Sequence, residues 1–400
     1  MKIIVQKFGG TSVSTEEKRN QVVAKVKNAI ENGYSPVIVV SAMGRQGEPY
    51  ATDTLLSLTD NDFKINNLQA VDMLMCCGEI ISSIIMSNLL INKGINAIPL
   101  TGGQAGIITN EKFSAADVIC TNPKKIIEAL EDRKVPVITG FQGVSENGYF
   151  TTLGRGGSDT SACIIGEALK AEEIEIYTDV DGIMTADPRI VKDASLINNI
   201  SYTEVFQLAD QGAKVIHPRA VEYAKKANIP IFIKNTMNDC NGTLINNIGD
   251  KDKKKIISGI THLNNRVQVT VKLKENRENN KYRELLNILA ENKISLDLIN
   301  IFPKEQIFTI DYSKKDKVEE VLNNAKLKYN FIKDCSTIAI VGIGMRGVPG
   351  IMAKIINILS ENSIEILQTA DSNITIWCLI ETKYINKSLN LLHKAFKLNE

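Results

Sequence analysis

Two short segments bring together residue types that can hold a phosphate or a carboxylate. KFGGTS (Lys7–Ser12) directly follows the apolar run IIV, and TLGRGGSDTSA (Thr152–Ala162) sets Arg155 among glycines before a helical pattern, with Ser158 at the expected N-cap. Glycine lets backbone amides turn towards an anion, helix N-termini carry unpaired amides, and arginine grips an anion with two parallel hydrogen bonds. The first segment alone fits a plain strand-to-helix turn equally well. The second predicts an anion site, because paired glycines weaken a fold and have little structural reason to occur here.

Two further segments have the same character but are weaker alone. YTDVDGIMTADPR (Tyr177–Arg189) leaves an apolar run for a loop rich in Asp, Thr and Pro, and QGAKVIHPRAVEYA sets Lys214 near the start of a helix. Four such loops in one α/β domain are expected to converge where strands end and helices begin. The Walker A pattern GxxxxGK[ST] is absent from the sequence.

A fifth glycine-rich segment, GIGMRG (Gly342–Gly347), matches the pattern of dinucleotide-binding turns. About fifty residues follow it, too few for the remainder of a doubly wound dinucleotide fold. We therefore favour a tight strand-to-helix turn over a nicotinamide site.

Composition excludes several classes of protein. Hydrophobic residues make up 44% and charged residues 23% of the 400 residues, as in soluble proteins of two or three domains. The net charge of +1 argues against nucleic acid as a partner. Seven cysteines without a CxxC pair and three histidines predict neither disulfides nor a metal site. The most apolar stretch, Ile80–Ile91, is too short to span a bilayer, and the N-terminus lacks a secretory signal, so we expect a cytoplasmic protein without membrane contact.

Strand and helix patterns alternate from Met1 to about Lys234. The expected strands are residues 2–8, 35–42, 96–102, 135–141 and 173–179, and the expected helices are 16–33, 67–93, 124–133 and 161–171. Unbroken apolar runs are typical of strands that are buried on both faces of a parallel sheet. The first part of the chain is therefore predicted to be an α/β domain, with an open, mainly parallel sheet and helices on both faces.

A polar, charged stretch, Asn246–Lys255, is typical of an exposed linker, and an internal repeat follows it. Residues 266–326 and 337–397 each show the order strand, helix, strand, strand, helix, with ILAENKI and ILSENSI at matching places. Two ferredoxin-like βαββα units account for this pattern.

Taken together and in order, these segments resemble the aspartate kinases of the amino-acid kinase family. KFGGTS is similar to the opening signature of that family, TGFQG (Thr139–Gly143) and TTLGRGGSDT to its substrate loops, YTDVDGIMTADPR to its nucleotide segment and GAKVIHP to the segment of its phosphate lysine. The repeat is similar to paired ACT domains, ferredoxin-like βαββαβ units that bind regulatory amino acids. The resemblance covers nearly the whole chain, and the boundaries it implies are a kinase domain over 1–245, a linker over 246–260 and ACT domains over 261–335 and 336–400.

The resemblance implies transfer of the ATP γ-phosphoryl group to the β-carboxylate of L-aspartate, the first step towards lysine, threonine and methionine. A carboxylate with a pKa of about 4 is already ionised at neutral pH, so the reaction needs no general base. Catalysis is then positioning and charge neutralisation, with Mg²⁺ bound mainly through the ATP phosphates. Two alternatives stay open. One is another amino-acid kinase acting on glutamate, acetylglutamate or a nucleotide, and the other is a fused dehydrogenase or an effector-binding module without catalysis.

The resemblance also assigns roles to individual residues. Lys7 is expected to neutralise the migrating phosphoryl group, Lys214 to hold ATP phosphates, and Arg155 to clamp the α-carboxylate of aspartate. Asp159 completes this catalytic set, and with Glu79 it is expected to receive the α-ammonium group. For Glu79, a helix N-terminal charge favoured by the dipole is the alternative. The other expected nucleotide-binding residues are Phe8, Gly9, Gly10, Thr178, Asp179, Met184 and Arg189. The other expected substrate-binding residues are Ser41, Thr52, Gly156 and Ser158.

For the repeat, the resemblance implies regulation by lysine, threonine or both. The expected effector-binding residues are Met345, Val348, Gly350, Gln368 and Asp371. The helix after Pro349 would offer its amides to an effector carboxylate and Asp371 would receive an ammonium group, although a solvated loop charge explains Asp371 nearly as well. The expected assembly is a homodimer through Ile256–Glu400, or a tetramer, because pairing covers exposed strand edges.

Overall fold

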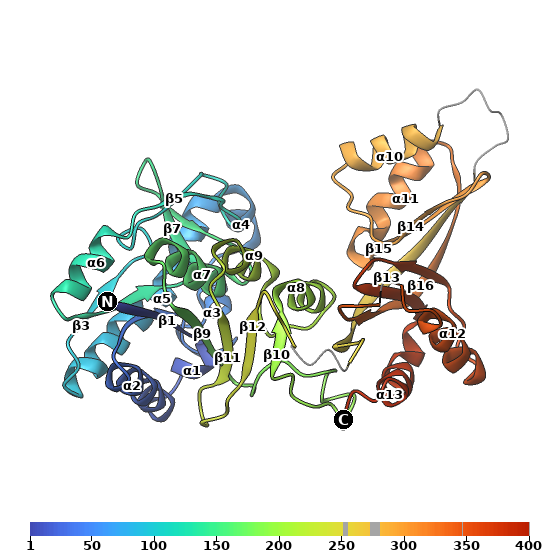
Figure 1. The fold of residues 1–400 in the computed structure, drawn as a ribbon. Coiled ribbons are helices and arrows are strands. Elements are labelled where there is room, and N and C mark those ends of the chain that lie inside the picture. Colours follow the sequence, from blue (N-terminus) through green and yellow to red (C-terminus); the bar gives the residue numbers. More distant parts are fainter. Residues whose placement is uncertain (251–254, 273–280, 346, 400) are drawn as a thin grey trace. The chain divides into compact units, whose positions relative to one another are not determined.

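The chain forms two compact units. The computed structural model describes residues 1–250, 255–272, 281–345 and 347–399 (Figure 1). Unit 1 consists of Met1–Ile183, Leu196–Asp210 and Lys214–Asp252, and unit 2 consists of Met184–Ser195, Gln211–Ala213 and Lys253–Glu400. Four parts of the sequence predictions lie outside the described residues. These are residues 251–254 of the expected linker, residues 273–280 of the first repeat, Arg346 of the glycine-rich turn and Glu400 at the end of the second repeat.

Unit 1 is built on an eight-stranded sheet. In sheet order its strands are β10 (Asn199–Ser201), β12 (Thr243–Asn246), β11 (Ile231–Asn235), β9 (Glu173–Thr178), β1 (Lys2–Phe8), β2 (Tyr34–Val40), β6 (Val135–Thr139) and β3 (Ala97–Leu100). Every neighbouring pair from β11 to β3 is parallel, and β11 runs antiparallel to β12. The expected open, mainly parallel sheet is confirmed, and its strands are apolar at consecutive positions because both faces are covered.

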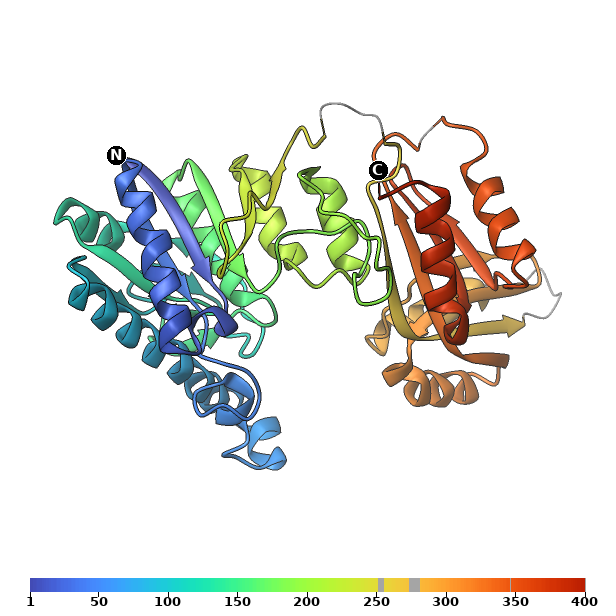
Figure 2. The same ribbon diagram turned by 90° about the horizontal axis from the view of Figure 1, so that it is seen from below.

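Helices cover both faces of this sheet. The helices of unit 1 are α1 (Gly10–Val13), α2 (Glu16–Glu31), α3 (Thr52–Leu56), α4 (Asn61–Asn66), α5 (Leu68–Asn92), α6 (Lys124–Glu131), α7 (Gly157–Leu169), α8 (Tyr202–Asp210) and α9 (Pro218–Ala227). On one face, Val26 of α2 and Leu90 of α5 pack with Val40 of β2 in one core cluster, and α2 lies in dark blue along the sheet in Figure 2. On the other face, α7 approaches β9 so closely that a Cβ on Gly166 would lie 2.7 Å from the Ile174 side chain.

Helix α5 is longer than the apolar stretch singled out in the sequence. By length and composition it could cross a membrane, but half of its most apolar 18-residue segment is buried inside the structure. It also buries two carboxylates, Asp72 and Glu79, and three serines. These are the properties of a helix packed in a protein core, and a single helix that passes the length test is weak evidence of a membrane span.

A second, four-stranded sheet of unit 1 was not predicted from the sequence. In sheet order it consists of β5 (Val118–Thr121), β4 (Ile107–Thr109), β7 (Gln142–Ser145) and β8 (Phe150–Thr152). Its strands have three or four residues each, too few to show a clear period of two. The sheet carries the segments that precede the glycine–arginine loop, Gly154–Gly157, and so it helps to place that loop.

Unit 2 contains the predicted repeat. Its elements are β13 (Gly259–Lys272), α10 (Lys281–Glu291), β14 (Ile299–Ile301), β15 (Glu305–Asp311), α11 (Lys315–Asn324), β16 (Lys328–Val341), α12 (Ile351–Glu361), β17 (Gln368–Asp371), β18 (Thr375–Glu381) and α13 (Ile385–Ala395), with 3₁₀ turns at Tyr312–Lys314 and Thr382–Tyr384. The sheet order is β14-β15-β13-β16-β18-β17. The two ferredoxin-like units are confirmed, but β13 and β16 are longer than the sequence predicted.

The two long strands join the repeats. Strand β13 pairs with β16 along nearly its whole length, while β15 pairs with residues 266–272 of β13 and β18 with residues 335–341 of β16. Each repeat therefore takes half of the other repeat's long strand into its own sheet. Residues 184–195 also belong to this unit: Thr185 Oγ1 lies 2.9 Å from His393 Nε2 of α13.

Candidate active site

The end of β1 lies against the loop that follows β2. The Gly9 amide donates to the Tyr177 carbonyl (3.2 Å), and the Gly44 amide donates to the Gly10 carbonyl (3.0 Å). A Cβ on Gly10 would lie only 2.5 Å from the Ala42 carbonyl oxygen, a contact that real Cβ atoms do not make. Glycine at position 10 is therefore required for this close approach of two backbones.

The first turn of α7 closes the site from the other side. Gly156 is the N-cap, in the left-handed conformation with φ 67°, and no described side chain caps the helix. Ser158 is the second helical residue, so the prediction that it is the N-cap is wrong. A glycine takes the cap because the turn needs a positive φ. Ser158 instead faces the end of β6, since a Cβ on Gly140 would lie 2.8 Å from its Oγ.

An ion pair joins β1 to this helix. The Nζ atom of Lys7 lies 2.7 Å from Oδ1 of Asp159, and their side chains are 11% and 13% exposed. The structure thus brings together two members of the predicted catalytic set. Arg155, in the loop before the helix, is exposed.

Glu79 is a buried ionisable group of unit 1. It is 2% exposed, its Oε1 accepts a hydrogen bond from the Ala42 amide (3.1 Å), and its Oε2 has no partner among the described residues. Burial raises its pKa to about 8, against the lowering effect of the Ala42 hydrogen bond. Glu79 lies in the middle of α5, so the alternative of a helix N-terminal charge is wrong.

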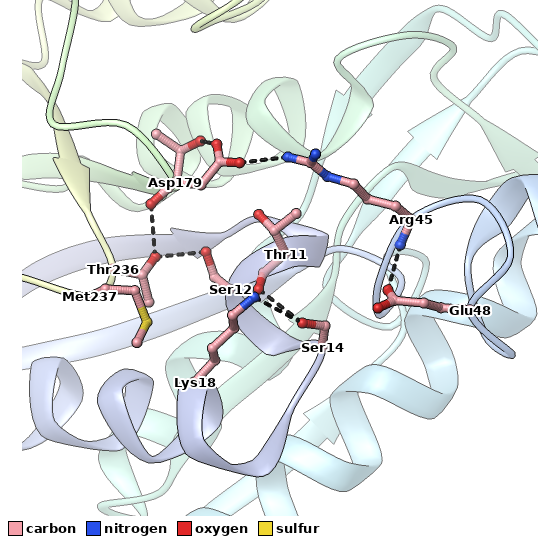
Figure 3. A pocket seen from close by; sticks show the side chains of 10 residues that line it. Thr11, Ser12, Ser14, Lys18, Arg45, Glu48, Asp179, Thr236 and Met237 are labelled. Atoms are coloured by element: carbon pink, nitrogen blue, oxygen red, sulfur yellow. Dashed lines mark hydrogen bonds and ion pairs between the residues drawn. The ribbon is translucent and has the colours of Figure 1, made fainter.

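A pocket of about 340 Å³ opens at the carboxyl ends of β1, β9 and β11 (Figure 3). Its lining residues are Thr11, Ser12, Ser14, Lys18, Arg45, Glu48, Thr178, Asp179, Thr236 and Met237. Five hydroxyl side chains, two cations and two carboxylates thus line it. Strand β1 has β2 as its neighbour on one side and β9 on the other, so the order of the strands reverses at β1. The carboxyl edge of an open α/β sheet at such a point is the usual place for a ligand.

The polar groups of this pocket already contact one another. Ser12 Oγ lies 2.6 Å from Thr236 Oγ1, and Arg45 Nη2 lies 2.5 Å from Asp179 Oδ2 in an exposed ion pair. Lys18 Nζ donates a long hydrogen bond to Ser14 Oγ (3.4 Å). These contacts join the turn after β1 to the ends of β9 and β11.

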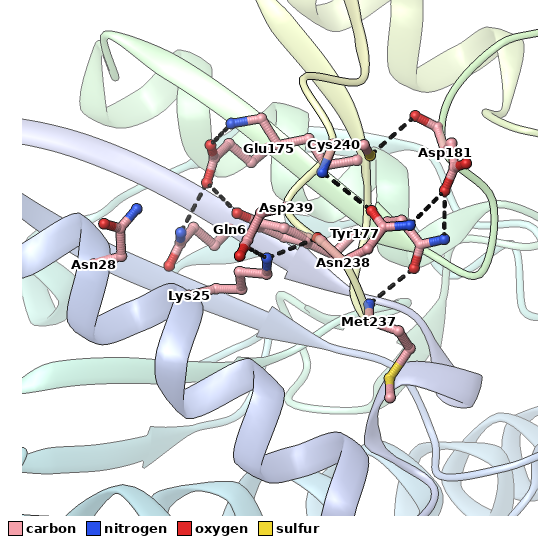
Figure 4. Close-up of polar contacts among 12 residues, drawn as sticks. Gln6, Lys25, Asn28, Glu175, Tyr177, Asp181, Met237, Asn238, Asp239 and Cys240 are labelled. Carbon is pink, nitrogen blue, oxygen red and sulfur yellow. Dashed lines mark hydrogen bonds and ion pairs between the residues drawn. The ribbon is translucent and has the colours of Figure 1, made fainter. Parts of the chain in front are cut away.

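A buried carboxylate supports the same strands from the α2 side (Figure 4). Glu175 is 5% exposed, accepts hydrogen bonds from Gln6 Nε2 (2.8 Å) and the Tyr177 hydroxyl (3.1 Å), and pairs with Lys234. Burial and the nearby Glu175 charge raise the pKa of Tyr177. The network links β1, β9 and β11, the strands at whose ends the pocket opens. In the sequence, this network was indicated by the polar residues that alternate with apolar ones in EIEIYT (Glu173–Thr178).

Other predicted residues are placed less tightly. Thr52 begins α3, Ser41 donates its amide to the Phe8 carbonyl (3.2 Å), and Lys214 is exposed ahead of α9. Met184 and Arg189 belong to unit 2, where Arg189 is exposed and paired with Asp187 (2.7 Å). Their assignment to the nucleotide stays a prediction.

His217 was not singled out in the sequence. It is the N-cap of α9, where its Nδ1 accepts from the Arg219 amide (3.3 Å). A Cβ on Gly156 would lie 2.2 Å from the His217 side chain, so the ring packs against the glycine–arginine loop. Burial lowers the pKa of His217 although the Asp159 charge opposes this. Its signal was the His-Pro pair that opens a helix pattern.

The expected effector residues occupy different environments within unit 2. Met345 is buried, Val348 is 37% exposed, and Gly350 is the N-cap of α12 with φ 91°. Gln368 is buried, and its side-chain Nε2 donates to the Leu298 carbonyl (2.8 Å). Gln368 also donates to Asn300 Oδ1, so it connects the two repeats, while Asp371 is exposed at the end of β17.

Comparisons with known proteins agree with this architecture. Residues 2–235 match the amino acid kinase family, and residues 330–394 match an ACT domain. The chain is 42% identical over 405 residues to aspartokinase 1 of Bacillus subtilis (strain 168), and the match covers 100% of both chains. The aspartate kinase of Clostridium acetobutylicum has a TM-score of 0.77 and 26% identity, covering 99% of this chain and 100% of that one. E. coli aspartokinase III in complex with aspartate and ADP shares the fold, with a TM-score of 0.80, 23% identity and coverage of 98% and 99%.

The eight-stranded sheet, the glycine turns at its carboxyl edge and the match over most of unit 1 define an amino acid kinase. The 42% sequence identity to a known aspartokinase over the full length identifies one group within this family. The chain belongs to the aspartokinases, the enzymes that phosphorylate aspartate.

Proposed function

We propose that the chain transfers the γ-phosphoryl group of ATP to the β-carboxylate of L-aspartate beside Lys7, as the first step towards lysine, threonine and methionine. One observation carries the assignment of the site. Glu79, a buried carboxylate with one oxygen unpartnered among the described residues, accepts from Ala42 in the loop Ser41–Gly44. Phe8 and Gly10, which follow the buried Lys7 in the chain, hydrogen-bond to the same loop. An amino-acid substrate would bring an ammonium group as the partner of Glu79. The transferred phosphoryl group would bring negative charge, which Lys7 neutralises.

The aspartate subsite lies on the Glu79 side of Lys7. The α-ammonium group binds Glu79, and the α-carboxylate binds the exposed guanidinium of Arg155, whose fork matches a carboxylate. The first turn of α7, with Gly156 and Ser158, offers uncapped amides to the same anion. Ser41 and Thr52 complete the predicted contacts. Asp159 is engaged by Lys7 in this structure, so its first effect is to hold that lysine in place.

The nucleotide subsite is the pocket of Figure 3. Its hydroxyls, Lys18 and Arg45 are suited to phosphate oxygens, as are the backbone amides of Gly9 and Gly10, and Lys214 is assigned to the phosphates by the resemblance. Asp179, a carboxylate of the pocket, is suited to contact Mg²⁺ that is held mainly by the phosphates. When bound, Mg²⁺ would neutralise phosphate charge.

Charge neutralisation is the main task of the residues around the transferred group. The attacking carboxylate and the nucleotide are both anionic, so their repulsion opposes the reaction. Lys7, which pairs with Asp159 in the first turn of α7, and the positive end of that helix reduce this repulsion. No group is needed to remove a proton from the acceptor, since aspartate arrives ionised.

The direct test is ADP release by the full-length chain with ATP and Mg²⁺, measured with aspartate and, as matched controls, with glutamate and acetylglutamate. We expect release with aspartate and only background release with the controls. Release with acetylglutamate or glutamate at a comparable kcat/KM would refute the proposed substrate, while Lys7→Ala tests whether the activity belongs to this site.

We also propose feedback regulation through unit 2 by lysine, by threonine or by both, in a cytoplasmic homodimer or tetramer that contacts neither nucleic acid nor membrane. The ACT match supports this, and E. coli aspartokinase III, which shares the fold, has been solved in complex with lysine and aspartate. Titrating each amino acid against activity is the test, with Asp371→Ala expected to raise the inhibitory concentration and leave the uninhibited kcat unchanged. Inhibition by neither would refute it.

A further inference from the structure

A second buried carboxylate of α5 has no part in the proposed reaction. Asp72 is 0% exposed and lies about two helical turns before Glu79, on the same side of α5. Its oxygens accept hydrogen bonds from four donors on two other segments. Thr152 donates its amide (2.7 Å) and its hydroxyl (3.0 Å), and Ser114 donates its amide (2.9 and 3.0 Å) and its hydroxyl (3.3 Å).

These donors belong to the segments that support the glycine–arginine loop. Thr152 is the last residue of β8, and Arg155 follows a few residues later. Ser114 lies under the loop, since a Cβ on Gly154 would be 3.3 Å from the Ser114 carbonyl oxygen. The Ala116 amide donates to the Thr152 carbonyl (2.9 Å), so the two segments are also joined to each other. Asp72 therefore fixes the root of the loop that carries Arg155.

A role in stability alone does not account for a charge at this position. Removing a carboxylate from water is costly, and burial accordingly raises the pKa of Asp72 against the effect of its hydrogen bonds. Apolar residues of similar volume often stabilise a core as well as a buried ion does. A carboxylate is distinguished by accepting from all four donors while bringing no proton of its own.

We propose that Asp72 is a positioning residue for the amino-acid substrate. By holding Thr152 and Ser114 it sets Arg155 at a fixed spacing from Glu79, so that one helix determines the separation of the groups that bind the two ends of the substrate. The inference rests on the proposed function, in which Arg155 binds the α-carboxylate and Glu79 the α-ammonium group.

The test uses Asp72→Asn in the full-length chain. The amide side chain has one acceptor oxygen and points an N–H at the remaining donors, so one or two buried hydrogen bonds are lost. We expect KM for aspartate to rise roughly ten- to a hundredfold and KM for ATP to stay within about twofold. The control is Asp62→Asn, an exposed acid of α4 with the same change of charge, which is expected to alter neither constant.

A double-mutant cycle with Arg155→Ala separates positioning from general support of the fold. If Asp72 acts through Arg155, then Asp72→Asn changes kcat/KM by less than about threefold once Arg155 is gone. An equal loss in both backgrounds, or an equal rise of both KM values, would overturn the proposal. If Asp72→Asn does not fold, Thr152→Val replaces it in the cycle with an expected three- to tenfold change, roughly that of one hydrogen bond. A wild-type chain without aspartate-dependent ADP release would instead refute the proposed function, which distinguishes the two failures.

Discussion

Replacing Glu79 by glutamine changes substrate binding and stability in opposite directions. Burial raises the Glu79 pKa from the usual 4.5 to about 8, so at neutral pH the carboxyl group of the free enzyme is mostly protonated. Aspartate binds through its ammonium group and therefore has to displace that proton. KM for aspartate should accordingly fall as the pH rises towards 8. Relative to its constant value above pH 8, KM for aspartate is expected to be roughly tenfold higher at pH 7 and a hundredfold higher at pH 6. Each pH unit below the pKa of Glu79 weakens aspartate binding by about 1.4 kcal/mol.

The same shift predicts how Glu79 contributes to the stability of the free protein. Because the folded pKa of Glu79 lies above the unfolded value, the folded state binds the proton more tightly. The contribution of Glu79 to stability is then most favourable below about pH 4.5 and is lost as the pH rises from 4.5 to 8. The full loss is roughly 5 kcal/mol, the free energy of a pKa raised from 4.5 to about 8. Glu79→Gln removes this loss and keeps an oxygen for the Ala42 amide, so at pH 8 the variant should melt at a higher temperature than the wild type.

The assay is coupled ADP release at saturating ATP from pH 6 to 9, with melting temperatures measured in parallel. Glu79→Gln should raise KM for aspartate by roughly a hundredfold or more, because loss of one partner of a buried ion pair costs about 3 kcal/mol or more, and should flatten its pH dependence. The matched control is Glu204→Gln: Glu204 is also buried but accepts from the Ser201 hydroxyl (2.6 Å), so the variant should lose stability with KM unchanged. A wild-type KM that is constant from pH 6 to 8.5, or a Glu79→Gln variant that is less stable at pH 8, would refute the reasoning.

Three further predictions concern the turns around the site. Lys7→Ala should lower kcat by roughly a hundred- to a thousandfold. Adding Asp159→Asn should restore stability but not kcat, because Lys7→Ala leaves the nearly buried Asp159 carboxylate unpaired. An unchanged kcat in a folded Lys7→Ala variant would contradict the catalytic role of Lys7. Arg155→Lys should raise KM for aspartate while KM for ATP stays constant, since an ammonium cannot reproduce the guanidinium fork; the reverse pattern would move Arg155 to the nucleotide. Gly10→Ala should destabilise unit 1 and abolish activity, because its Cβ would lie 2.5 Å from the Ala42 carbonyl; a melting temperature equal to that of wild type would show that the loop yields.

Local sequence patterns were sufficient for much of this protein. Apolar runs alternating with helical periods predicted the parallel sheet from β1 to β9 and both repeats of unit 2, because burial on one or two faces imposes a period on the chain itself. Glycine was equally informative, since the positive φ of Gly156 and the close contact at Gly10 are demands that a single residue type meets. The segments Lys7–Ser12 and Thr152–Ala162 could therefore be identified without a structure.

Features that depend on distant partners could not be predicted in this way. The short strands of the four-stranded sheet form only because each finds a neighbour far along the chain, and β13 and β16 extend beyond their apolar runs because each pairs with the other. Ser158 was expected at the N-cap, but the turn that meets β6 puts Gly156 there. His217 became visible only when α9 packed against the glycine–arginine loop.

The sequence by itself thus determined the class of the protein, its longer helices and central strands, and the segments that carry the chemistry, since these depend on residue type and local period. Only the tertiary structure decided how those residues are charged and paired. Glu79 is an ordinary acid in the chain, but in the middle of α5, away from water and with one oxygen unpartnered, its pKa is raised to about 8. Lys7 meets Asp159 only because β1 and α7 lie side by side in the fold. Burial and pairing are properties of the surroundings, and the surroundings of a residue come from segments far from it in the sequence.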